Sequence, residues 1–234
     1  MEKLNVIYED NHIIVVLKPQ NVLSQGDATT DKSLLDMVKE YVKEKYNKPG
    51  NVFIGLVHRL DRPTGGIMVF AKTSKAASRL TEQMKNKQFC KKYLAVVVGT
   101  PRYKASRLEH FLKKDENTNV VKVVTRGEDG AKQAILEYKT LKTVDKVSLL
   151  EIQILTGRSH QIRVQMSQIG CPIFGDVKYN GDTLAKGHNL ALWAYELSFI
   201  HPTTKKPMMF RCIPPVDKTP WNVFEKEILI IESK

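Results

Sequence analysis

The chain of 234 residues is 42% hydrophobic, which allows a buried core and excludes a miniprotein that needs disulfides or a metal to fold. Its three cysteines are well separated and form no CxxC pair, a pattern typical of a reducing compartment. The charged amino terminus lacks the apolar stretch of a signal peptide, and no segment approaches the roughly 18 apolar residues that cross a bilayer. We therefore expect a cytoplasmic protein without a membrane partner.

The charge balance is strongly basic. Lysine and arginine number 37 against 25 aspartates and glutamates, giving a net charge of +12 and a pI near 9.5. This balance indicates a polyanionic partner such as nucleic acid, although a generally lysine-rich composition explains it equally well. The basic residues are spread along the chain rather than gathered in a tail. Any RNA-binding face must therefore be assembled by the fold.

In chain order, apolar periodicity and turn residues predict a single α+β domain over residues 1–234, with a mixed, largely antiparallel sheet. A hairpin comes first, with two short strands within residues 4–17 and a polar turn at 9–11. Helices are expected over residues 31–46, from Ser74 as N-cap to residue 86, and from Ser159 as N-cap to a stop at Gly170. Further strands are expected at residues 53–57, 67–71, 93–98, 120–125, 134–141, 147–155, 190–200 and 208–211.

The sequence carries no motif for a metal or a nucleotide cofactor. It has no Walker loop, no GxGxxG after a strand, no HExxH and no cysteine cluster with zinc spacing, and its six histidines occur singly. We therefore expect no cofactor and no metal site. The chemistry left to the chain is that of carboxylate, arginine and aromatic side chains.

The most unusual stretch is HRLDRPTGG, which runs from His58 to Gly66 between two expected strands. The positive charges of Arg59 and Arg62 favour the ionised form of Asp61 between them. Pro63 and the glycines indicate a tight turn, and loops anchored by strands often carry catalytic residues. The alternative is an aspartate that caps a turn and pairs with a neighbouring arginine, which is the commoner role for an aspartate when the loop is taken alone.

This stretch resembles the HRLDxxTSG motif of the RluA family of pseudouridine synthases, in which the aspartate is catalytic. Other segments resemble further motifs of that family, in the same order along residues 4–204. They are VIYEDNHIIVVLKP near the start, KYLAV from Lys92, LTGRSHQIRV from Leu155, GCPIFGD from Gly170 and LALWAYELSFIHPTT near the end. The chain is identified as a member of this family, and the resemblance implies the pseudouridine synthase fold with a central active-site cleft.

The resemblance implies an RNA pseudouridine synthase that isomerises specific uridines of rRNA or tRNA without a cofactor. The reaction breaks the bond between ribose C1′ and uracil N1 and rejoins the base through C5, with no redox change. A carboxylate such as Asp61 can act as nucleophile or stabilise positive charge at the sugar. By the same resemblance, Arg163 pairs with Asp61 and keeps it ionised, and Tyr93 lies against the target uracil.

The resemblance also implies how RNA is held. The target base must leave its stack, and Arg59 is expected to fill the gap that the base leaves. Two residues depart from the motifs, Gly65 for the serine of TSG and Gln165 for the histidine of RVH, and we expect them to tune the site. RNA contacts are expected from four residues, Arg59, Arg62, Arg158 and His160.

The expected partner is a structured stem-loop of rRNA or tRNA. The chain begins almost directly at the first hairpin, so we expect no amino-terminal S4 RNA-binding domain and recognition by a monomeric catalytic domain alone. Two other classes are considered. An RNA-binding protein of the same fold that has lost catalysis is disfavoured by the retention of Asp61, Tyr93 and Arg163. A small-molecule hydrolase with Asp61 as nucleophile would need a water-activating partner and no +12 surface.

Overall fold

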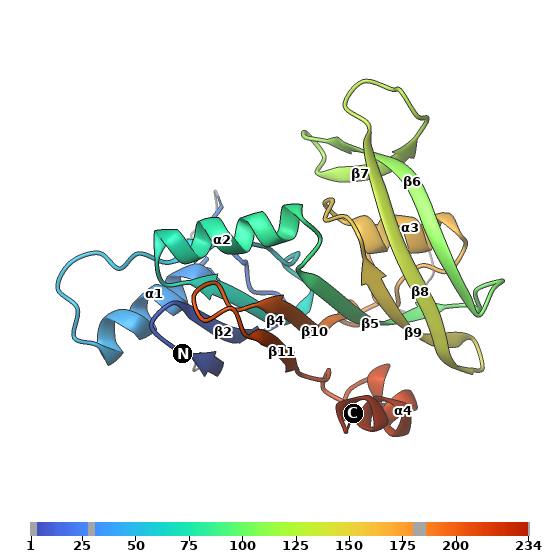
Figure 1. The fold of residues 1–234 in the computed structure, drawn as a ribbon. Helices are drawn as coiled ribbons and strands as arrows, with labels where there is room; N and C mark the ends of the chain where they lie inside the picture. The colour runs from blue at the N-terminus through green and yellow to red at the C-terminus, as the bar shows by residue number, and fades with distance from the viewer. Residues whose placement is uncertain (1–3, 28–30, 180–185, 234) are drawn as a thin grey trace. The chain divides into compact units, whose positions relative to one another are not determined.

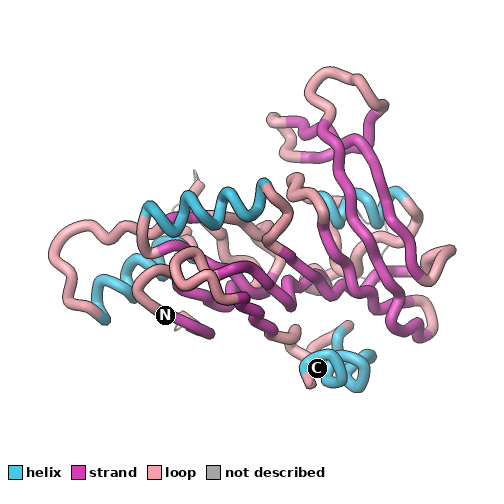
Figure 2. Tube along the Cα trace, viewed as in Figure 1, coloured by secondary structure: helices cyan, strands magenta, loops and turns pink. Residues whose placement is uncertain are grey.

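The computed structural model describes residues 4–27, 31–179 and 186–233. The chain forms two compact units. The first consists of Met1–Cys90 and Ala194–Cys212, and the second of Lys91–Trp193 and Ile213–Lys234. Both units combine helices with strands, as Figures 1 and 2 show, so the predicted α+β class is confirmed.

The first unit is built on the strand order β1-β2-β4-β10, with β3 paired to β4 and β11 paired to β10. The pairings β1·β2, β2·β4, β3·β4 and β10·β11 are antiparallel. The hairpin expected at the start and the last strand pair are both confirmed. The elements are β1 (Asn5–Glu9), β2 (Ile13–Lys18), α1 (Leu34–Lys45), β3 (Gly55–Leu56), β4 (Gly65–Ala71), α2 (Ser74–Lys85), β10 (Leu192–Ile200) and β11 (Pro207–Arg211).

In the core of the first unit, alternate residues of each strand point to the same face of the sheet. Ile13 and Val15 of β2 share one face with Ile67 and Val69 of β4, and α2 packs Leu80 into the same cluster. Helix α2 begins after Thr73, whose Oγ1 accepts the N–H of Ala76 at 3.1 Å. The N-cap expected at Ser74 was therefore one residue late, because threonine caps as serine does.

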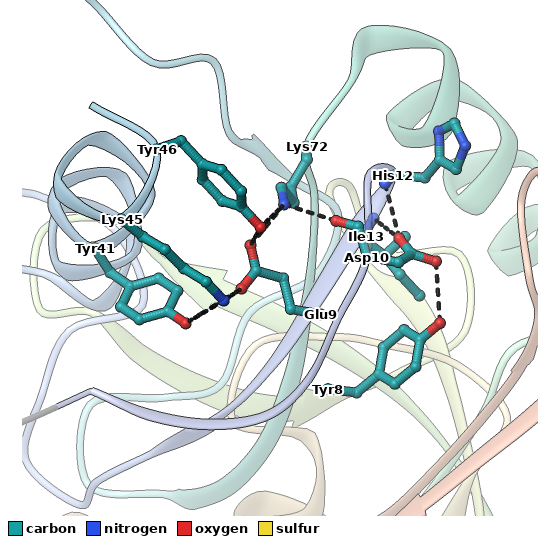
Figure 3. Close-up of polar contacts among 9 residues, drawn as sticks. All are labelled: Tyr8, Glu9, Asp10, His12, Ile13, Tyr41, Lys45, Tyr46 and Lys72. Atoms are coloured by element: carbon teal, nitrogen blue, oxygen red, sulfur yellow. Dashed lines mark hydrogen bonds and ion pairs between the residues drawn. The ribbon is translucent and has the colours of Figure 1, made fainter. Parts of the chain in front are cut away.

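Glu9, at the end of β1, anchors the carboxyl-terminal end of α1 (Figure 3). Its carboxylate accepts hydrogen bonds from Lys45 and Lys72, both at 2.6 Å, and from the hydroxyls of Tyr41 and Tyr46. Burial by itself raises the pKa of this carboxyl, but the bonds from Lys45, Lys72 and Tyr46 outweigh burial and lower the pKa to about 2. A charged, nearly buried Glu9 therefore joins β1, α1 and the residue after β4.

The second unit contains the strand order β5-β9-β8-β6-β7, with antiparallel pairing between each of these neighbours. Val164 of α3 packs against Leu112, Val121 and Ala134, which come from β6, β7 and β8. The elements are β5 (Cys90–Val98), β6 (Ala105–Asp115), β7 (Val120–Val124), β8 (Lys132–Val144), β9 (Val147–Ile154), α3 (Gln161–Gln168), the 3₁₀ turn η2 (Trp221–Phe224) and α4 (Glu225–Glu232).

The sequence prediction omitted β6 and α4, and it misplaced the start of α3. The residue before α3 is His160 in the left-handed conformation, with φ of 51°, and it makes no side-chain cap. Gln161 instead holds the preceding turn, because its Oε1 accepts the N–H of Arg158 at 3.0 Å and the hydroxyl of Thr156 at 2.8 Å. The expected stop at Gly170 is confirmed, with a positive φ of 76° just after the C-cap.

Candidate active site

The loop from His58 to Gly66 alternates between buried and accessible residues. His58 and Leu60 point inward, Arg59 and Arg62 are exposed, and Asp61 is half-buried. The Nε2 of His58 accepts the N–H of Val69 at 3.1 Å. His58 therefore fixes the loop to β4, while Arg59, Asp61 and Arg62 remain accessible.

A short segment after β2 holds the loop from the other side. Ser24 Oγ accepts the N–H of Leu60 at 3.0 Å and donates to the carbonyl of the same residue at 2.7 Å. Gln20 Nε2 donates to the carbonyl of Pro63 at 3.1 Å. The backbone on both sides of Asp61 is thereby tied to residues that lie far from it in the sequence, which fixes the position of the carboxylate.

Lys18 also holds the loop. Its side chain is fully buried, and Nζ donates to the carbonyls of Pro19, Val22 and Arg62 at 2.9, 2.5 and 3.0 Å. Burial lowers the pKa of Lys18 to about 7, while the negative charge of Asp61 opposes that change. The ammonium of Lys18 is thus close enough to Asp61 for the two charges to interact.

The sequence motifs indicate no role for Lys18. The available signal was weak, since Lys18 continues the alternating face of Ile14 and Val16 on β2 but also stands at the end of the strand, where an exposed lysine is common. Only the three carbonyls that surround its ammonium reveal the buried charge. These carbonyls come from two loops, so no local pattern predicts them.

Gly66 is required where the loop enters β4. Its φ is 128°, and a Cβ atom there would lie 2.3 Å from the carbonyl oxygen of Ala194 and 2.5 Å from its nitrogen. Side chains cannot approach backbone that closely, so only glycine fits. Gly65, which departs from the family motif, is buried as the first residue of β4. Its effect on the site stays a prediction.

The two arginines of the loop differ in their contacts. Arg62 donates from Nε to the carbonyl of Asn21 at 3.1 Å and from Nη2 to Asp31 at 2.7 Å, so it braces the loop. The side chains of Arg62 and Asp31 are both about half exposed. Because solvent screens their charges, this ion pair adds little stability. Arg59 is exposed on the same loop. Their expected RNA contacts stay predictions.

Arg163 lies on α3 in the second unit and is buried. Its Nε and Nη2 donate to the two carboxylate oxygens of Asp176 at 2.7 and 2.6 Å, the forked geometry that orients a guanidinium most firmly. Asp176 belongs to the GCPIFGD segment, but the sequence analysis assigned it no role. The pairing of Arg163 with Asp61 stays a prediction.

The other expected site residues of the second unit lie on β5 and at the start of α3. Tyr93 is buried on β5, opposite Ile152 of β9. Arg158 is exposed, and its Nε donates to the carbonyl of Gln133 at 2.9 Å. The Nδ1 of His160 lies 2.7 Å from the hydroxyl of Tyr179. The structure thus groups His160 with a residue that the sequence analysis did not single out.

Gln165, the second departure from the family motifs, faces strands β6 and β8 and is fully buried. Its Nε2 donates to the carbonyls of Leu108 and Ala134 at 3.3 and 3.2 Å and lies 3.0 Å from Nδ1 of His110. Burial lowers the pKa of His110, which favours the neutral ring, and the two Nε2 protons are shared among these three acceptors. Gln165 therefore anchors α3 to the strands.

The HPTT segment near the end of the chain has a structural task in the first unit. The Nδ1 of His201 accepts the N–H groups of Thr203 and Thr204 at 3.1 and 2.8 Å. That leaves Nε2 to donate to Asp10 at 2.8 Å, and Asp10 in turn accepts two backbone N–H groups of the first hairpin. This motif therefore ties the turn after β10 to the first hairpin.

Comparison with known proteins shows which family the chain belongs to. Residues 12–168 match the model of the RNA pseudouridylate synthase family. An uncharacterized RNA pseudouridine synthase, YlyB of Bacillus subtilis, is 33% identical over 92% of this chain and 70% of its own length. Ribosomal large subunit pseudouridine synthase D of Borreliella burgdorferi is 34% identical over 82% of this chain and 60% of its own length. Ribosomal large subunit pseudouridine synthase C of Rickettsia bellii is 36% identical over 76% and 58%.

Among solved structures, human RNA pseudouridylate synthase domain containing 4 shares the fold with a TM-score of 0.75, at 24% identity over 90% of this chain and 88% of that one. The family model and the curated relatives place this protein in the class of RNA uridine isomerases. The chain belongs to the RNA pseudouridylate synthase family, and within it to the RluA type. Among the described residues, no helix is long and apolar enough to span a membrane.

Proposed function

We propose that this protein converts uridine to pseudouridine in large-subunit ribosomal RNA, with Asp61 as the essential carboxylate. The observation that carries the proposal is the environment of Asp61, a half-buried carboxylate on a loop held by Lys18, Gln20 and Ser24. Its accessibility lets a substrate reach it, and the fixed backbone keeps it in one place, which is what preorganised catalysis needs.

The chemistry balances without any added group. The C1′–N1 glycosidic bond breaks, a C1′–C5 bond forms, the proton on C5 leaves to solvent, and N1 gains a proton. Asp61 acts on the sugar either as nucleophile or by stabilising positive charge. Tyr93 faces the uracil in this proposal, and Arg163 favours the ionised carboxylate. The roles of these two residues follow from the family motifs.

The substrate class rests on the names of the relatives, two of which are ribosomal large subunit pseudouridine synthases. A net charge of +12 suits a polyanionic substrate. We further propose that the two units act together as one catalytic domain, that the protein works as a cytoplasmic monomer, and that the target is a short stem-loop. Size-exclusion chromatography with light scattering tests the monomer, and a dimer mass would contradict it.

Tritium release tests the activity. RNA labelled with ³H at C5 of uridine loses its label only when C5 becomes bonded to ribose. We expect release from unmodified large-subunit rRNA, with one mole or a small whole number of moles per mole of RNA. Tritium release from tRNA and not from rRNA would show that tRNA is the substrate. Tight rRNA binding without any release would identify an RNA-binding protein that has lost catalysis and would contradict the proposal.

A further inference from the structure

Tyr179 contacts three separate parts of the site in the second unit. Its hydroxyl lies 2.7 Å from Nδ1 of His160, and its ring lies 5.1 Å from the guanidinium carbon of Arg163. Its backbone carbonyl accepts the hydroxyl of Ser167 at 2.9 Å. One residue outside the helix therefore meets the start, the middle and the end of α3.

The hydroxyl of Tyr179 also meets a group that can only donate. The backbone N–H of Val121 on β7 points at the phenol oxygen at 2.8 Å, so the oxygen accepts that bond. Nδ1 of His160 lies 2.7 Å away, within reach of the phenol proton, and accepts it when that nitrogen carries no proton of its own. A neutral imidazole that accepts at Nδ1 carries its proton on Nε2.

The guanidinium of Arg163 contacts two residues of the following turn. It donates two hydrogen bonds to the carboxylate of Asp176, and it packs on the ring of Tyr179. Asp176 Oδ1 also accepts the N–H groups of Lys178 and Tyr179, at 2.9 and 3.1 Å. The turn that carries Tyr179 is thereby tied to the same carboxylate that orients Arg163. The attraction between a cation and the face of an aromatic ring stabilises a buried pair more than a pair exposed to water.

We propose that Tyr179 is a positioning residue of this site: its hydroxyl holds His160 as the tautomer with the proton on Nε2, and its ring fixes the plane of Arg163. The catalytic part of this inference rests on the proposed function, because it requires that Arg163 and His160 serve the reaction. The tautomer of His160 does not depend on that function and can be measured in the protein alone. A group that bonds one ring nitrogen of a functional histidine sets the tautomer and orientation of the ring. Removing such a group commonly lowers activity, although the group does not touch the substrate.

Tyr179→Phe tests the hydroxyl, and Tyr138→Phe is its matched control. Tyr138 is a buried tyrosine of the same unit, and its hydroxyl donates to a backbone carbonyl, that of Tyr103, at 3.1 Å. The first readout is the ¹⁵N spectrum of labelled imidazoles, in which His160 is assigned by the loss of its signals in His160→Gln. We expect Nδ1 of His160 to carry no proton in the wild type, to show mixed tautomers in Tyr179→Phe, and to be unchanged in Tyr138→Phe.

The second readout is the single-turnover rate on rRNA. We expect Tyr179→Phe to lower it about tenfold with RNA affinity within about twofold, as for other groups that orient a functional side chain. Tyr138→Phe should keep the wild-type rate. A proton on Nδ1 in the wild type, or unchanged His160 signals in Tyr179→Phe, would overturn the tautomer assignment. A changed tautomer with an unchanged rate would overturn the positioning role, and an inactive wild type with the expected tautomer would count against the proposed function alone.

Discussion

The ammonium of Lys18 donates a 3.0 Å hydrogen bond to the backbone carbonyl of Arg62, the residue that follows Asp61. This bond joins the buried amine of Lys18 to the loop that carries the candidate catalytic carboxylate. Lys18 thus links two properties of the site, the fixed path of the loop and the electrostatic setting of Asp61.

Lys18→Met should weaken the loop and remove a pH dependence of stability. Burial lowers the pKa of Lys18 to about 7 in the folded protein, against 10.5 in the unfolded chain. Between these two pH values the unfolded state holds a proton that the folded state lacks. The free energy of unfolding therefore increases as pH rises, by at most about 1.4 kcal/mol per pH unit from this group. Urea unfolding of wild type and variant from pH 6 to 10 measures it, and parallel curves would contradict the assignment.

Glu9→Gln should destabilise the first unit at neutral pH by about 2 kcal/mol or more, because it leaves the buried ammonium of Lys72 without a charged partner. With a folded pKa of about 2 against 4.5, Glu9 contributes stability that is present above pH 4.5 and is lost as pH falls toward 2. The variant should lack this part of the acid transition. Glu40→Gln is the control, since its pair with Lys32 is exposed and worth about 1 kcal/mol at most. Equal losses for both variants would refute the role of Glu9.

Gly66→Ala should disrupt the entry of the loop into β4. The new Cβ atom would meet the backbone of Ala194 at 2.3 Å, and the φ of 128° is strained for alanine, so we expect a loss of about 3 kcal/mol or more in unfolding free energy. Gly26→Ala, with no atom within 4 Å of its Cβ position, should change it by about 0.5 kcal/mol or less. Thermal unfolding of both proteins decides the matter, and a stable, fully active Gly66→Ala protein would contradict the close approach.

Arg59 and Arg163 should respond differently to the state of the target base. If Arg59 fills the space of the flipped base, Arg59→Ala should be partly rescued by RNA whose target uridine is already unpaired, because unstacking then costs less. Arg163→Ala should gain no comparable rescue, since its defect lies in the electrostatics of the chemical step. Single-turnover rates of both variants on a stacked and an unpaired target measure this. Equal rescue of both would show that these roles are wrong.

Local sequence predicted the parts of the fold whose signal is local. The hairpin before Lys18 and the strand pair near the carboxyl terminus follow from apolar alternation and turns. Strand β6 was missed because His110, Glu109 and neighbouring basic residues interrupt its apolar residues, and although alternate positions of its first half are half-buried, Leu112 alone is fully inside. Ser159 was favoured as a cap by its residue type, but Gln161 holds that turn instead.

The residues of the candidate site also fall into two groups, those that a local motif predicted and those that only tertiary contacts reveal. Asp61 and Arg59 were found because they share one short motif. Asp176 stood within a recognised segment, yet its pairing with Arg163 spans 13 residues and becomes visible only when α3 and the following turn are in place. Tyr179 and Lys18 act through backbone groups of other segments, namely the N–H of Val121 and the carbonyl of Arg62. Sequence pattern gives the identity of such residues but not their partners.

Asp61→Asn carries the most direct test of the account. The amide keeps the shape of the side chain but cannot supply the negative charge, so the single-turnover rate of tritium release should fall by at least about a thousandfold. RNA affinity, measured by filter binding on the same rRNA fragment, should stay within about twofold, because the basic surface is unchanged. Mass spectrometry of the purified variant excludes deamidation back to aspartate. Tritium release by the intact Asp61→Asn protein at a rate near that of the wild type would contradict the central claim.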